Sequence, residues 1–126
     1  MSTEGRTDRV RLLYFLKRNP KISKEEFAHH WINIATPIYT SLDIVKRNNI
    51  TAQLTVSNDN VVGAHASGFP SSDWDGVATI EGPSFEKIFE SLLSDEYKSL
   101  VGIEMPKFLD PSKSQILPLN VIAVAE

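Results

Sequence analysis

The chain of 126 residues contains no cysteine. This absence excludes disulfide bonds, thiolate zinc sites and a cysteine nucleophile. The charges nearly cancel, with 13 Lys and Arg against 16 Asp and Glu, so no basic character points to nucleic acid or to an anionic membrane surface. No stretch approaches the roughly 18 apolar residues of a membrane span, and residues 1–8 lack the apolar region of a secretory signal. We therefore expect a soluble, cytoplasmic protein with a disordered tail (1–8) and one domain (9–126).

The sequence also lacks the motifs that hold cofactors. It contains no GxGxxG, no P-loop and no GxSxG motif, so nucleotide, flavin and serine hydrolase chemistry have no support. His29 and His30 are the only adjacent histidines, and neighbouring positions on a helix point about 100° apart, which prevents them from sharing a metal ion. The sequence predicts neither a metal nor a cofactor.

Four segments have the character of β-strands, at residues 9–17, 50–56, 73–81 and 116–124. In the first, Val10, Leu12, Tyr14 and Leu16 fall on one face by a period of two, and further apolar residues fall on the other. The last strand is also apolar on both faces, and its Pro118 indicates an edge position or a bulge. A strand that is apolar on both faces is normally covered on both.

Two segments have helical periodicity. Ser23 and Glu26 form a capping-box pattern that opens an apolar series running from Phe27 to Val45 at spacings of three and four. Pro37 lies inside that series and predicts a kink or a split in the helix. A second helix is predicted to start at Ser84 and to continue to about residue 93.

The order of these elements is β-α-β-β-α-β, which is the ferredoxin-like α+β topology. It predicts a four-stranded antiparallel sheet with two helices on one face. The opposite face is then bare, although the first and last strands carry apolar residues on both sides. We expect a second copy to cover it, sheet against sheet, in a symmetric homodimer.

Three stretches resemble the EthD family of dimeric α/β-barrel proteins: residues 15–31 (FLKRNPKISKEEFAHHW), 74–77 (WDGV) and 104–111 (EMPKFLDP). The resemblance covers roughly residues 9–125, and the order and spacing of the stretches carry it. It implies a dimeric α/β barrel. The nearest relatives it implies are stand-alone fungal members of aromatic polyketide pathways, which act as cofactor-independent dehydratases or decarboxylases. Where that family has a histidine in helix one and another in strand two, this chain has Ala35 and Thr55.

Histidine is the first candidate for proton transfer because it titrates near neutral pH. His65 lies between two alanines in the long polar segment 57–72, and connections of that length are usually functional or mobile. We predict His65 as the acid/base, with Asp73 beside it and His30 as a further catalytic residue. The alternatives are a half-buried His30 bonded to backbone, and Asp73 and Asp75 as turn-capping or solvated carboxylates.

Aromatic side chains on the predicted strands and helices suit a flat apolar ligand, and they suit an ordinary core nearly as well. The predicted substrate-binding residues are Tyr14, Trp31, Tyr39 and Phe89. The leading hypothesis is a cofactor-independent lyase that dehydrates or decarboxylates an aromatic polyketide intermediate. A cofactor-free monooxygenase of anthrone-like substrates is the second hypothesis. A non-catalytic binding or stress-response dimer is the third, and Ala35 and Thr55 favour it.

Overall fold

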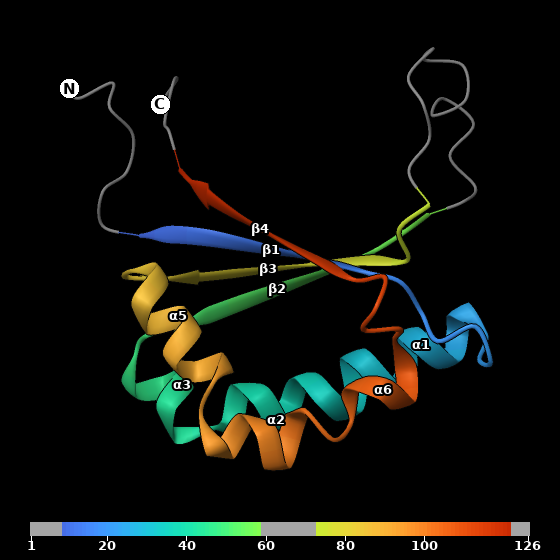
Figure 1. Cartoon of the computed structure of the whole chain (residues 1–126), viewed down its shortest axis with the longest axis horizontal. Helices are drawn as coiled ribbons and strands as arrows, with labels where there is room; N and C mark the ends of the chain where they lie inside the picture. Colours follow the sequence, from blue (N-terminus) through green and yellow to red (C-terminus); the bar gives the residue numbers. More distant parts are fainter. Residues whose placement is uncertain (1–8, 59–72, 122–126) are drawn as a thin grey trace.

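The computed structural model describes residues 9–58 and 73–121, and Figure 1 shows their arrangement. The sheet has the order β2-β3-β1-β4, and every neighbouring pair is antiparallel. Its strands are β1 (Val10–Leu16), β2 (Thr51–Val56), β3 (Gly76–Gly82) and β4 (Gln115–Asn120). This confirms the predicted four-stranded antiparallel sheet. It also confirms the edge position of Pro118, because β4 pairs only with β1.

All helices of the described chain lie on one side of the sheet (Figure 1). The capping box at Ser23 is present as predicted, with the Ser23 side chain accepting from the Glu26 N–H and the Glu26 side chain accepting in return from the Ser23 N–H. The helices are α1 (Lys24–His30), the π-helix η1 (Trp31–Ala35), α2 (Thr36–Ser41), α3 (Asp43–Arg47), α5 (Phe85–Leu92), the π-helix η2 (Tyr97–Val101) and α6 (Met105–Phe108).

The first helical segment does not show the predicted split at Pro37. The backbone keeps helical dihedrals at Ala35 and Thr36, and Pro37 lies in the first turn of α2. The preceding turn is π-helical, with the Thr36 N–H donating to the Trp31 carbonyl. The interruption comes instead at Leu42, whose extended backbone separates α2 from α3.

The core between sheet and helices consists of two clusters of buried apolar residues. One surrounds Leu12 and Ile88, and the other surrounds Leu16, Phe27 and Phe108. The second cluster depends on a close approach at β3, since a Cβ atom at Gly76 would lie 2.6 Å from the Trp31 ring. Gly76 therefore lets the indole pack directly on the backbone of the sheet.

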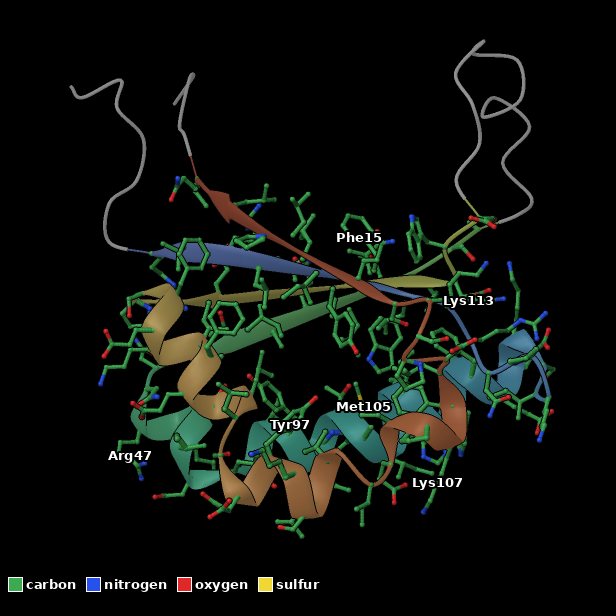
Figure 2. The ribbon with its side chains drawn as sticks, in the orientation of Figure 1. Phe15, Arg47, Tyr97, Met105, Lys107 and Lys113 are labelled. Carbon is green, nitrogen blue, oxygen red and sulfur yellow. The ribbon has the colours of Figure 1, made fainter. Side chains whose placement is uncertain are left out.

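The face of the sheet away from the helices is mixed in character. Phe15 projects from it (Figure 2), and Leu13 lies opposite Leu117 of β4, which is 44% exposed. Arg11 pairs with Glu81 nearby, so polar and apolar side chains alternate across this face. Among the described residues, no helix is both long and apolar enough to span a membrane.

Candidate functional site

A cavity of about 50 Å³ lies between the helices and the sheet and is partly open to solvent. Its floor comes from β1, β2 and β3, and its walls come from η1, α2, the end of α5, η2 and the start of α6. Figure 2 shows Tyr97 and Met105 between the helices and the sheet. The lining is almost entirely apolar or aromatic: Tyr14, Trp31, Ala35, Thr36, Tyr39, Ala52, Leu54, Ala78, Ile80, Leu92, Tyr97, Val101 and Met105.

Both π-helices contribute to the cavity wall. Trp31 and Ala35 come from η1, while Tyr97 and Val101 come from η2, which ends with the Gly102 N–H donating to the Tyr97 carbonyl at 2.7 Å. A π-turn widens the helix locally, and such turns occur often at functional sites. Here residues of both turns line the same cavity.

Three tyrosines supply most of the polar character of the cavity. The Tyr39 hydroxyl lies 3.1 Å from the hydroxyl of Ser91, and its ring meets that of Tyr97 edge-on with centroids 5.8 Å apart. The hydroxyls of Tyr14 and Tyr97 make no hydrogen bond to any described residue. Burial raises the pKa of all three phenols, and mutual repulsion with Tyr14 and Tyr39 raises the pKa of Tyr97 further. The cavity therefore holds neutral phenols at physiological pH.

The predicted ligand-binding residues separate into two groups. Tyr14, Trp31 and Tyr39 line the cavity, whereas Phe89 packs on the outside of the first core cluster and does not reach it. Ala35, at the position where the resemblance implies a histidine, also lines the cavity. Thr55 lies outside the lining, and its hydroxyl donates to the Val77 carbonyl at 2.9 Å.

His30 lies beside the cavity wall without contributing to it. Its Nε2 is 2.9 Å from Glu104 Oε1, and its ring stacks on Phe108 with centroids 5.1 Å apart. Glu104 also accepts a hydrogen bond from Lys107 at 2.8 Å. The hydrogen bond from Lys107, and to a smaller extent the one with His30, lowers the pKa of the Glu104 carboxyl. His30 is thus half-buried, as in the alternative to a catalytic role, but its hydrogen-bond partner is the Glu104 carboxylate just before α6 and not a backbone group. The pair connects α1 to the start of α6.

The two aspartates lie at the end of the sheet, away from the cavity. Asp75 is 7% exposed and accepts from the Arg18 N–H at 2.8 Å, with Lys17 and Arg18 side chains within 4 Å. Asp73 is 91% exposed and pairs with Lys17 at 3.3 Å. The contacts of Asp75 are those of a carboxylate that caps a strand end.

His65 lies outside the described residues, as does most of the segment in which it was predicted (59–72), so its role stays a prediction. Within residues 9–58 and 73–121, no three His, Asp or Glu side chains come together as a metal site would require.

Sequence reasoning missed Tyr97 and Met105, two residues of the cavity wall that follow α5 in a stretch with no clear periodicity. One signal could have indicated Tyr97: its aromatic ring lies four residues after the end of the second predicted helix, at about residue 93.

The family model of the EthD domain matches residues 19–112. A search of curated proteins finds no match to the chain. Among solved structures, an EthD family protein from Bacillus halodurans is 18% identical, with 86% of this chain and 96% of that one covered and a TM-score of 0.55. A dimeric ferredoxin-like protein from Thermobifida fusca is 8% identical, covers 96% of both chains and has a TM-score of 0.60. A dimeric ferredoxin-like protein from Bacteroides fragilis is also 8% identical, with 92% and 98% covered and a TM-score of 0.57.

At these identities the solved structures support the fold alone, and they agree with the strand order and one-sided helix layer of this chain. The family match runs from the turn before α1 to the turn before β4, so it includes every element that lines the cavity except β1. The chain therefore belongs to the EthD domain family and has its ferredoxin-like α+β fold.

Proposed function

We propose that the protein is a cofactor-independent lyase that removes water or carbon dioxide from an aromatic or pre-aromatic polyketide intermediate bound in the cavity. The observation that carries the proposal is an apolar, aromatic-lined cavity whose polar groups are neutral phenols. The resemblance to fungal polyketide proteins supplies the reaction class.

Either reaction needs little beyond such a cavity. Dehydration breaks a C–H bond next to a carbonyl and a C–O bond, and it forms a C=C bond and water. Decarboxylation breaks the bond to the carboxylate, and the ring carbon then takes up a proton. In both cases negative charge moves onto a carbonyl oxygen, which hydrogen bonds from Tyr14 or Tyr97 would stabilise inside an apolar site.

The proton transfer itself is assigned to His65 alone, because Asp73 is exposed at the end of the sheet and does not line the cavity. General acid–base catalysis contributes about 10²- to 10⁴-fold, so His65→Ala should lower turnover by that factor. His29→Ala is the matched control, because His29 is an exposed histidine whose side chain forms a hydrogen bond only with Asn33 among the described residues. A His65→Ala protein with full turnover would exclude His65 as the acid/base.

The reaction class is tested by incubating the purified protein with a panel of aromatic polyketides and measuring product masses. Loss of the mass of water or of carbon dioxide is the expected result. Oxygen uptake with a gain of oxygen in the product would instead support the alternative of a cofactor-free monooxygenase.

A specific observation favours a second function, that of a non-catalytic binding protein. Within the described part of the chain, the cavity wall contains no imidazole, carboxylate or amine, and Ala35 occupies the position of the family histidine. Tight binding of panel compounds without any change of mass would support this function over the lyase.

We also propose that two copies pair through the open face of the sheet to form a dimeric α/β barrel. Phe15 projects from that face, away from the helices (Figure 2), and Leu117 of β4 is exposed. The similar proteins from T. fusca and B. fragilis are dimeric. Phe15→Glu should convert the dimer to a monomer in light scattering. Arg47→Glu, on the far side of the helix layer, should leave the mass unchanged.

A further inference from the structure

The hydrogen bonds around Tyr39 fix the direction in which its hydroxyl donates. The Ser91 hydroxyl is fully buried and donates to the Ile88 carbonyl at 2.6 Å. A serine hydroxyl has one proton, so Ser91 must accept in its contact with Tyr39 at 3.1 Å. Tyr39 is therefore the donor, and its phenolic oxygen retains lone pairs that can accept from a ligand.

The other two phenols, unlike Tyr39, can donate to a ligand as well as accept from it. Tyr14 and Tyr97 make no hydrogen bond to the described residues, so each keeps its proton available. All three tyrosines line the same cavity, and the rings of Tyr39 and Tyr97 meet edge-on with centroids 5.8 Å apart. The remaining polar side chain of the wall is Thr36, whose hydroxyl can rotate to donate or accept and so favours neither role.

The described wall also lacks charge. None of its residues is Lys, Arg, His, Asp or Glu, so an ionised ligand group would lose its hydration without gaining an ionic partner. The cavity holds only a few water molecules and is partly open to solvent, and the flexible Met105 in its wall can adapt its shape to a ring.

We infer that the cavity recognises an uncharged ring compound carrying both a hydroxyl and a carbonyl group, the hydroxyl donating to Tyr39 and the carbonyl accepting from Tyr97 or Tyr14. This inference rests on the proposed function in taking the cavity as the substrate site. It goes further by assigning an acceptor and a donor position. It also excludes a carboxylate from the bound group, which favours dehydration over decarboxylation as the reaction.

The test uses four probes of similar shape, namely ethylbenzene, acetophenone, 1-phenylethanol and benzoate, titrated against the full chain by NMR. In the wild type, acetophenone and 1-phenylethanol should each bind about threefold to tenfold more tightly than ethylbenzene, as one net hydrogen bond provides. Benzoate should bind most weakly.

Ser91→Ala tests the direction of the Tyr39 hydroxyl. The substitution removes the acceptor of the Tyr39 proton, which becomes free to bond a ligand carbonyl. The affinity ratio of 1-phenylethanol to acetophenone should fall by about threefold to tenfold. Tyr39→Phe should lower the same ratio, and Tyr97→Phe combined with Tyr14→Phe should raise it. Ser99→Ala, an exposed helical serine outside the cavity that also donates to a backbone carbonyl, should leave it unchanged.

The outcomes separate this inference from the proposed function. Folded Ser91→Ala and Tyr39→Phe proteins that keep the wild-type ratio would overturn the inference even if the protein proves to be a lyase. Probes that bind with the expected ratios, in a protein that changes no panel compound, would support the inference and contradict the lyase. Failure of every probe to bind in the cavity of the wild type would overturn both.

Discussion

The cavity and the ion pairs around it use polar side chains in opposite ways. In the cavity, the hydroxyls of Tyr14 and Tyr97 have no described partner and the surrounding wall is apolar. Outside it, His30, Glu104 and Asp75 are each bonded to a neighbour from another part of the chain. Two of the ionisable residues singled out in the sequence, His30 and Asp75, are thus held by partners that tie segments of the fold together, while the hydroxyls left without a described partner are weakly acidic phenols.

The largest effect is expected from the most buried of these ties. Asp75→Ala removes a charged acceptor from the Arg18 N–H and should lower the free energy of unfolding by about 1.5–3 kcal/mol in urea denaturation. Asp73→Ala, which removes an exposed carboxylate from the same turn, should cost less than about 0.5 kcal/mol. If both variants lose the same free energy of unfolding, the buried, hydrogen-bonded carboxylate of Asp75 stabilises the fold no more than the exposed one of Asp73.

The next effect concerns the cavity. Ala35→Leu adds three carbons to its wall and should weaken binding of acetophenone by about tenfold or more, while overpacking costs about 1–3 kcal/mol of stability. Ala28→Leu is the same substitution on α1 at a half-buried position outside the cavity, and it should leave binding unchanged. If Ala35→Leu binds the probe like the wild type, the ligand site lies elsewhere.

Ionisation of the three cavity tyrosines should lower the stability of the folded protein at alkaline pH. Their pKa values are raised above the ordinary 10.0, so the unfolded chain loses these protons at lower pH than the folded chain does. Their contribution is fully present below pH 10.0 and is lost as the pH rises through the folded pKa values. Denaturation midpoints measured from neutral to strongly alkaline pH should fall less steeply for Tyr97→Phe than for the wild type. Parallel curves would mean that burial of the Tyr97 phenol is not coupled to folding.

The smallest effect is expected at the acid limit. The pKa of Glu104 is lowered from the ordinary 4.5, first by Lys107 and also by His30. The stability it contributes is present above pH 4.5 and is lost as the pH falls through the folded pKa. Glu104→Gln should therefore have a flatter acid limb in thermal denaturation, with Lys107→Ala intermediate between it and the wild type. If the thermal midpoint of Glu104→Gln falls with decreasing pH as steeply as that of the wild type, the interactions of Glu104 with Lys107 and His30 do not stabilise the fold.

Much of the fold could be predicted from the sequence. Alternating apolar residues in β1 and the capping box at Ser23 are local signals, and each corresponds to an element in the structure. The strand order followed because the ferredoxin-like topology is a common solution for that order of elements. The π-turns could not be predicted, since a shift from i→i+4 to i→i+5 bonding at Trp31 leaves the spacing of apolar residues almost unchanged.

The candidate site was only partly predictable. Tyr14, Trp31 and Tyr39 were found because they lie on apolar stripes that face the sheet or the helices. Tyr97 was missed because η2 follows a break in periodicity, and Phe89 was included although α5 turns it onto the outside of the core cluster. The polar partners of His30 and Asp75 lie 74 and 57 residues away in the sequence, at a separation where local patterns carry no information.

The kinds of elements, their order and the absence of thiol chemistry follow from local sequence, because periodicity, capping and composition can be recognised without knowing which distant segments meet. Which polar groups have partners depends on the folded chain, because those partners come from distant segments. Ser91 of α5 accepts a hydrogen bond from Tyr39 and Glu104 pairs with His30, while Tyr14 and Tyr97 line a cavity that no local pattern predicts.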